Sequence, residues 1–158
     1  MMLKIISGGQ TGADRAALDA AIKHGVPCGG WCPDGRLAED GPIPGRYPLQ
    51  ELKGGSYLDR TRQNVIGSDG TAIFHFGPLE GGTAATLGFS VESGKPRLLI
   101  NAAEIPTGRA VELIRAFVSD LGVSVLNVAG PRASEEALAY PYAFAVVDAL
   151  LSCFVGMV

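Results

Sequence analysis

The sequence has few of the residues that form metal sites or cross-links. Its 158 residues include two histidines and three cysteines. The cysteine count is odd and the first residues do not resemble a secretory signal, so we expect reduced thiols and a cytoplasmic location. Cys28 and Cys32 are spaced as C-x3-C without a second pair of ligands nearby. A zinc site is therefore not expected.

The sequence also lacks an excess of basic charge and long apolar runs. The formal net charge is −3, which argues against nucleic-acid binding because such proteins carry a basic stripe. No apolar run approaches the roughly 18 residues of a membrane-spanning helix, so we expect no membrane insertion. Hydrophobic residues make up 47% of the chain and charged residues 18%. This composition predicts one compact domain over residues 1–158 and indicates a homo-oligomer.

Several common catalytic and nucleotide-binding motifs are missing. The glycine-rich stretch Ser7–Arg15 has neither the Gly-Lys-Ser/Thr ending of a Walker A loop nor the G-x-G-x-x-G spacing of a dinucleotide-binding loop. The chain contains no G-x-S-x-G motif, and no Ser-His-Asp order indicates a hydrolase triad. Binding of NAD or ATP and triad catalysis are therefore not predicted.

The same glycine-rich stretch is the most informative feature present. It follows the apolar run Leu3–Ile6 and precedes an alanine-rich run at 16–22, a pattern typical of a strand, a glycine turn and a helix. A helix that begins in such a turn directs its free N–H groups and the positive end of its dipole at the turn, which favours a bound anion such as phosphate. The alternative is a tight turn whose glycines adopt positive φ.

The rest of the chain alternates between apolar segments of strand length and helical segments. This alternation predicts an α/β fold with a mostly parallel sheet of about five strands and helices on both faces. We expect strands at 3–7, 26–32, 71–76, 96–101 and 123–128, a long loop at 33–48, and helices at 12–24, 56–65, 83–93 and 107–121. The remainder after residue 134 is expected to be helical and broken near Pro141. Its apolar run 144–154 suggests that this helix, or an equally apolar one, is buried in an oligomer.

In a parallel sheet, the loops that follow the strands meet at one edge, where ligands bind. These loops are 8–12, 29–41, 77–83 and 129–132, and they contain many of the glycines. The loops at Gly25, Gly94 and Gly122 are ordinary helix ends. The sequence therefore predicts a ligand cleft at the carboxyl ends of the strands.

Two of these loops carry further polar residues. Gly81–Thr83 opens a helix, so it is a second candidate anion site to which Thr83 and Thr86 add hydroxyls; the alternative is a turn with a threonine N-cap. Asn127 could recognise an amide edge of a ligand, and Arg132 could pair with a phosphate. The alternative for this loop is a surface turn with a solvated arginine.

Other candidates have equally plausible structural roles. Trp31 could stack on a flat ring or fill the core. Arg60 and Asn64 lie four residues apart on one helical face, which is a ligand face or a solvated one. Asp14 suits the first turn of a helix and could accept a hydrogen bond from a ligand hydroxyl or amino group. His75, between two phenylalanines, is expected to be a structural histidine.

Several motifs along nearly the whole chain together resemble the molybdenum carrier family. They are Ser7–Arg15, Gly29–Pro33 with Arg36, Ala38–Pro44, Tyr47–Glu51, Arg60–Asn64, Gly81–Thr83, Gly94–Pro96 and Leu126–Arg132. The family belongs to a Rossmann-like group of ligand-sensing proteins called SLOG, which also includes the lysine-decarboxylase-like phosphoribohydrolases. The resemblance therefore implies a three-layer Rossmann-like fold.

The resemblance also implies a small cytoplasmic protein, in many cases a homotetramer, that binds and protects the molybdenum cofactor. Molybdoenzymes or cofactor-synthesis proteins are its expected partners. The cofactor is a phosphorylated pterin that carries its own metal, so neither a protein ligand to molybdenum nor a catalytic residue is expected. The expected cofactor-binding residues are Gly8, Gly9, Gln10, Thr11, Gly12, Asp14, Arg15, Trp31, Arg36, Arg60, Asn64, Gly81, Gly82, Thr83, Thr86, Asn127, Gly130 and Arg132.

Two alternatives to a carrier remain open at this point. The phosphoribohydrolases, which act on nucleoside monophosphates, have the loop P-G-G-x-G-T-x-x-E with a catalytic glutamate. Here the loop Leu79–Thr86 lacks the second Gly-Thr pair and the following glutamate, and Glu80 precedes its glycines. This departure disfavours the enzyme. A nucleotide-sensing module without catalysis is the other alternative.

Overall fold

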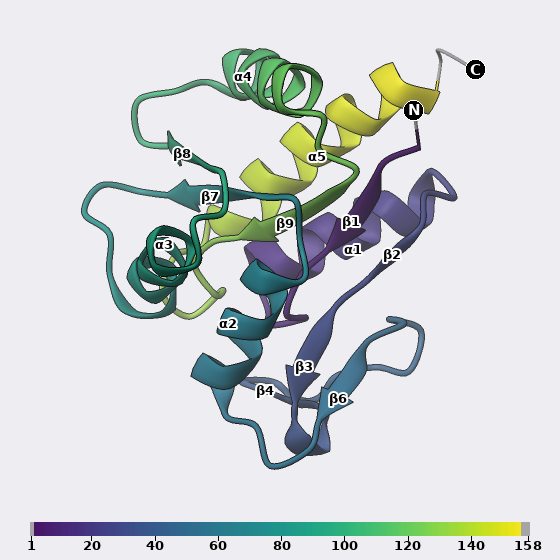
Figure 1. The fold of residues 1–158 in the computed structure, drawn as a ribbon, viewed down its shortest axis with the longest axis vertical. Helices are drawn as coiled ribbons and strands as arrows, with labels where there is room; N and C mark the ends of the chain where they lie inside the picture. The colour runs from purple at the N-terminus through teal and green to yellow at the C-terminus, as the bar shows by residue number, and fades with distance from the viewer. Residues whose placement is uncertain (1, 156–158) are drawn as a thin grey trace.

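A five-stranded parallel sheet forms the centre of the protein (Figure 1). The structure is a computed structural model that describes residues 2–155. Residues 1 and 156–158 of the predicted domain lie outside the described residues. Neighbouring strands pair in the order β2-β1-β9-β7-β8, and all four ladders are parallel. The strands are β1 (Lys4–Ile6), β2 (Cys28–Gly29), β7 (Gly70–His75), β8 (Arg97–Asn101) and β9 (Val125–Ala129).

Helices cover both faces of this sheet, which confirms the predicted three-layer Rossmann-like fold. One layer is formed by α1, α4 and α5, and the other by α2 and α3 (Figure 1). The buried side of α1 consists mainly of alanines, and their small side chains let α1 pack closely against α5. The helices are α1 (Ala13–Lys23), α2 (Tyr57–Ile66), α3 (Gly81–Ser93), α4 (Thr107–Leu121) and α5 (Ala139–Val155).

The last helix differs from the sequence prediction at its start. Residues 133–138 form turns, and α5 begins at Ala139 and continues through Pro141 without a break. Proline is tolerated there because the N–H groups of a first helical turn have no partner inside the helix. Val147 and Leu150 of α5 are fully buried within one chain. The apolar character of α5 is thus explained without a partner chain, and the homo-oligomer stays a prediction.

The segment between β2 and α2 is more ordered than the predicted long loop. Gly30 has φ of 126°, a conformation that favours glycine, and the chain leaves the central sheet there. The expected strand at 26–32 is consequently divided between β2 and β3. This segment contains β3 (Trp31–Pro33) paired with β6 (Gln50–Leu52), the 3₁₀ helix η1 (Asp34–Arg36), and β4 (Leu37–Ala38) paired with β5 (Gly41–Pro42).

A second, small apolar cluster holds this segment against the Rossmann-like core. Ile43, Tyr47 and Leu49 are buried together with Leu18 of α1. This packing fixes the segment beside the start of α1, next to the carboxyl ends of the central strands. None of the helices described between residues 2 and 155 is long and apolar enough to cross a membrane.

Candidate functional site

A cleft lies at the carboxyl ends of β1 and β9, between α2 and α3. The chain leaves β1 toward β2 and leaves β7 toward β8, on opposite sides of β9. Open α/β sheets bind ligands at such a reversal of direction. The volume of the cleft is about 170 Å³. It is lined by Gly8, Gln10, Asp14, Tyr57, Leu58, Arg60, Thr61, Asn64, Gly82, Thr83, Thr86, Asn127, Val128, Ala129, Gly130, Arg132 and Glu135.

The first glycine loop contributes little free hydrogen-bonding capacity to this cleft. The N–H of Gln10 donates to Asp14 Oδ2 at 3.3 Å, and the N–H of Thr11 donates to the side chain of Gln10 at 3.1 Å. The N–H of Ala13 donates to the carbonyl of Pro131 at 3.2 Å. Protein groups therefore already occupy donors that the sequence suggested for an anion.

Two glycines of this loop are explained by protein packing. Gly9 has φ of 76°, and a Cβ atom there would lie 2.3 Å from Leu49 Cδ1. Gly12 has φ of 81°, and a Cβ atom there would lie 2.3 Å from the carbonyl oxygen of Pro131. Neither residue lines the cleft. Both glycines permit close contacts with distant parts of the chain.

The second glycine loop is open. Among the described residues, no protein group accepts a hydrogen bond from the N–H of Gly82 or Thr83 at the start of α3. Glu80 is the N-cap residue of α3, and its side chain does not cap the helix. Thr86 donates back to the carbonyl of Gly82 at 2.9 Å. The Thr83 hydroxyl makes no hydrogen bond to the described residues and lies in the lining of the cleft. The free donors of α3 and the Thr83 side chain meet in the cleft.

Arg60 places a buried positive charge beside the same cleft. Its Nη1 donates to the carbonyl of Gly8 at 2.7 Å, and its Nε donates to the carbonyl of Tyr57 at 3.2 Å. Its side chain is only 8% exposed. Its Nη2 makes no hydrogen bond to the described residues, so it can donate to a ligand in the cleft. The contact with Arg60 also explains Gly8, because a Cβ atom there would lie 2.3 Å from Arg60 Nη1.

Asp14 is the acidic group at this end of the cleft. Burial raises its pKa from the usual 3.8 to about 6, although Arg60 and the N–H of Gln10 act in the opposite direction. Its Oδ2 lies 3.8 Å from Arg60 Nη1. A carboxyl group that titrates near neutrality in a cleft marks a candidate functional position.

The loop between β9 and α5 completes the lining. Asn127 is almost fully buried and donates through Nδ2 to Thr71 Oγ1 at 3.3 Å, while its Oδ1 has no partner among the described residues. Arg132 is partly exposed and pairs with Glu135 at 2.8 Å. Sequence reasoning missed Glu135 and also Tyr57, which lines the opposite side. The i, i+3 spacing of Glu135 from Arg132 was an available signal for that ion pair.

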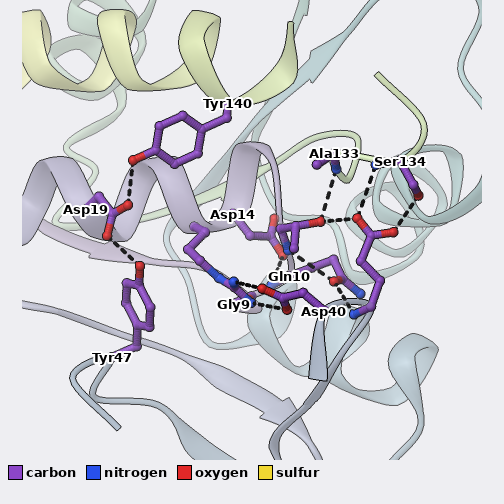
Figure 2. A network of polar contacts seen from close by, with 12 residues as sticks. Gly9, Gln10, Asp14, Asp19, Asp40, Tyr47, Ala133, Ser134 and Tyr140 are labelled. Carbon is purple, nitrogen blue, oxygen red and sulfur yellow. Dashed lines mark hydrogen bonds and ion pairs between the residues drawn. The ribbon is translucent and has the colours of Figure 1, made fainter. Parts of the chain in front are cut away.

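Two predicted site residues, Thr11 and Arg15, do not line the cleft. They take part in a polar network with Gly9, Asp40 and Ala133, which Figure 2 labels. The Thr11 hydroxyl and both the N–H and hydroxyl of Ser134 donate to the carboxylate of Glu39. Arg15 donates to the carbonyl of Gly9 and pairs with Asp40 at 2.5 Å. This network ties the β4–β5 hairpin to the loop that carries Arg132.

Three other predicted residues have structural contacts. Trp31 lines a separate groove beside β2, not the cleft. Arg36 donates to four backbone carbonyls between residues 43 and 49, and this holds the small sheets together. Asn64 lines the cleft, but its amide bonds both the N–H and the carbonyl of Trp31, at 2.8 and 3.0 Å. Gly81, at the start of α3, does not line the cleft.

The predicted convergence of four loops is therefore only partly correct. The loops that follow β1, β7 and β9 meet in the cleft, and the loop after β2 does not, because the chain leaves the sheet at Gly30. His75 is half-buried, with Nδ1 2.7 Å from the carbonyl of Gly77, so its expected structural role fits. Within residues 2–155, no group of three or more His, Cys, Asp or Glu side chains could hold a metal ion.

Comparisons with known proteins agree with this architecture. A family model of cpYpsA, the circularly permutated YpsA SLOG family, matches residues 5–151. The chain belongs to this family. A crystal structure from Syntrophus aciditrophicus SB, named "Putative molybdenum carrier protein", is similar to this cpYpsA protein with a TM-score of 0.92. The two share 47% sequence identity over 95% of each chain. No curated protein matches the chain at a significant level.

The family match includes every residue that lines the cleft of this cpYpsA protein. The acid of its second glycine loop, Glu80, does not line that cleft, whereas Asp14 and Glu135 do. Residues 83–86, which follow the glycines of this loop, include no glutamate. The family is a SLOG family, and the similar crystal structure bears the name of a molybdenum carrier.

Proposed function

We propose that this protein binds and carries the molybdenum cofactor, with the phosphate of the pterin held at the start of α3. The observation that carries this proposal is the set of free donors in one cleft. The N–H groups of Gly82 and Thr83, the Thr83 hydroxyl and Arg60 Nη2 have no protein acceptors in the described chain. Backbone N–H groups at a helix start and a buried guanidinium together suit a phosphate dianion.

The residues fit the phosphorylated end of such a ligand better than they enclose the whole of it. A volume of about 170 Å³ is smaller than the roughly 300–1,000 Å³ of pockets that enclose drug-sized ligands. The cofactor would thus be held at its phosphate and along one edge of the pterin. Its remaining surface would be accessible for transfer to a molybdoenzyme or a cofactor-synthesis protein, and a homo-oligomer could cover part of it.

The first experiment asks which small molecule accompanies the protein. The protein would be purified without oxygen from cells that make molybdenum cofactor, and the released ligand analysed by mass spectrometry for phosphorylated pterin and by elemental analysis for molybdenum. We expect both in near-equal amounts. A nucleotide without molybdenum would overturn the carrier proposal.

The second experiment tests the phosphate site directly. Calorimetry would compare guanosine 5′-monophosphate with guanosine, since this pair differs only in the phosphate. Thr83→Ala removes one hydroxyl, so we expect it to weaken binding of the nucleotide by about tenfold or more and binding of the nucleoside little, because a hydrogen bond to a charged group contributes about 1.5–3 kcal/mol. Thr61→Ala is the matched control, because the Thr61 hydroxyl donates to the carbonyl of Tyr57. Equal affinity of the two probes for the wild type would contradict a phosphate site.

A further inference from the structure

The two ends of the cleft have opposite hydrogen-bonding character. The end at α3 presents donors, namely the N–H groups of Gly82 and Thr83. The end at β1 and β9 presents acceptors, which are the carboxylate of Asp14 and Oδ1 of Asn127. A ligand that used only its phosphate would leave the acceptor end without partners, and unsatisfied buried acceptors are unfavourable. The cleft therefore suits a ligand with an anionic end and a donor-bearing end.

Asp14 retains acceptor capacity for such a ligand. An ionised carboxylate has about four acceptor positions. The N–H of Gln10 uses one of them at 3.3 Å, and the backbone of Gly8 acts to lower the pKa of this carboxyl. Acceptor positions thus remain for groups in the cleft, where the Asp14 side chain is 13% exposed. Two adjacent N–H donors on a flat ring can form two parallel hydrogen bonds to the oxygens of a carboxylate, in the same geometry as the two N–H groups of a guanidinium.

We propose that Asp14 recognises the aminopyrimidinone edge of the ligand, which is the ring N–H and the neighbouring amino group shared by pterins and guanine. Asn127, almost fully buried with Oδ1 unpaired in the described chain, accepts a further donor from the same ring. This inference rests on the proposed function, because it requires the phosphate to lie at α3. Asp14 and Asn127 then determine which ring is bound, whereas the start of α3 at Gly82 and Thr83 holds its phosphate.

The charges around Asp14 favour this orientation over the reverse. Arg60 of α2 faces Asp14, Arg15 of α1 lies near it, and Arg132 and Glu135 line the same cleft. A phosphate placed against Asp14 would meet a negative charge where burial already disfavours the ionised carboxyl. Donors from a neutral ring would instead stabilise that ionised form. The raised pKa of about 6 fits a carboxylate that lacks enough donors in the free protein.

The test compares rings that differ only at this edge. Inosine 5′-monophosphate lacks the amino group of guanosine 5′-monophosphate, and lumazine replaces the amino group of pterin with an oxygen. Calorimetry at pH 7.5 should give at least about tenfold tighter binding of the guanine and pterin members of the two pairs. A larger affinity ratio between pterin and lumazine would identify pterins as the ligand class that the cleft recognises. A larger ratio between the guanine and inosine nucleotides would identify guanine nucleotides.

Variants and pH separate recognition of the ring from binding of the phosphate. Asp14→Asn should bind guanosine monophosphate and inosine monophosphate with equal affinity. Thr83→Ala should still prefer guanosine monophosphate to inosine monophosphate, but it should bind both nucleotides more weakly because it has lost a contact with the phosphate. Uncharged guanosine should bind the wild type more weakly at pH 5 than at pH 7.5, because protonated Asp14 loses acceptor capacity. This pH comparison needs no variant, so it holds even if Asp14→Asn does not fold.

Two outcomes would overturn the inference in distinguishable ways. Equal affinity for the guanine and inosine nucleotides, with phosphate preference intact, would remove the role of Asp14 and leave the proposed phosphate site standing. Tighter binding of guanosine at pH 5 than at pH 7.5 would contradict a carboxylate that accepts from the ring. Loss of the phosphate preference itself would overturn the proposed function as well.

Discussion

The two glycine-rich loops of this protein resemble one another in sequence and differ in what they can bind. Both follow a central strand and open a helix, and both contain adjacent glycines and a threonine. In the first, Gly8–Gly12, N–H groups are bonded by protein and two glycines accommodate other parts of the chain. In the second, Gly81–Thr83, the donors of Gly82 and Thr83 face the cleft, and a Cβ atom at Gly82 would meet nothing within 4 Å.

A glycine at a helix start can therefore either permit close packing or leave room for a ligand. The partner of Gly12 is Pro131, which lies far away in the sequence but adjacent in space. The first loop thus acts as a junction between β1, α1 and the loop before α5. The second loop is the better candidate for the anion, and the following changes test that contrast.

The largest expected effect is the contrast between Gly12→Ala and Gly82→Ala. Gly12→Ala should lower the free energy of unfolding by about 3 kcal/mol or more, because it combines a positive φ of 81° with a Cβ atom 2.3 Å from the Pro131 carbonyl. Gly82→Ala should change stability by less than about 1 kcal/mol. Urea unfolding of both variants measures the difference. Similar losses in the two variants would show that the loops are equally structural.

The next effect concerns the pH dependence of stability at Asp14. Its folded pKa of about 6 lies above the usual 3.8, so the stabilisation it contributes is fully present below pH about 4 and is lost as the pH rises through about 6. This corresponds to a loss on the order of 3 kcal/mol. In Asp14→Asn, the free energy of unfolding from urea titrations should therefore increase less between pH 7 and pH 4 than it does in the wild type. An unchanged profile would mean that Asp14 is not buried as described.

A smaller effect is expected where the β4–β5 hairpin is tied to the loop before α5. Burial raises the pKa of Glu39, but hydrogen bonds from Ser134 and Thr11 outweigh it and hold the pKa below its usual value. This contribution to stability is present at neutral pH and is lost as the pH falls through the lowered pKa. Glu39→Gln should cost about 1 kcal/mol at pH 7 and less at an acidic pH below the lowered pKa of Glu39, measured by urea unfolding.

The same network holds the loop that contains Arg132. Glu39→Gln should therefore also weaken the binding of guanosine monophosphate by a few-fold, as measured by calorimetry. Glu136→Gln is a control from the same region, because within residues 2–155 the one hydrogen bond of the Glu136 side chain is from the N–H of Leu138. If Glu136→Gln weakened nucleotide binding as much as Glu39→Gln, the loss of affinity would come from removal of a negative charge and not from disruption of the network.

The smallest change would convert the open loop into a capped one. Glu80 is the N-cap residue of α3 and makes no side-chain cap. Glu80→Ser should stabilise the protein by about 0.5–1 kcal/mol, because a serine oxygen can accept from the N–H groups of the first turn. The hydrogen bond from these N–H groups to the serine oxygen should compete with the phosphate. It should therefore weaken the binding of guanosine monophosphate more than the binding of guanosine. Improved nucleotide binding would show that the free N–H groups are not the anion site.

Much of the fold could be predicted from the sequence because it depends on local patterns. Apolar runs of strand length alternated with helical segments closed by glycines, such as Gly94 and Gly122, and both are helix ends in the structure. The small sheets at 31–52 could not be predicted in this way. Their strands are two or three residues long, and the buried contacts of Arg36 and Tyr47 hold them in place.

The candidate site was predictable in part for the same reason. The alternation of strands and helices was enough to predict that the strand-end loops with Thr83, Asn127 and Arg132 lie at one edge, because parallel strands direct those loops the same way. Only the tertiary structure decided which helix start is open, since the acceptors that close the first loop are contributed by Asp14 and by the distant Pro131. It also decided that Arg60 is a buried donor, because its burial depends on packing against Gly8. Hydrogen bonds between segments that are distant in the sequence depend on how the core packs. They therefore cannot be predicted from the spacing of residues along the sequence.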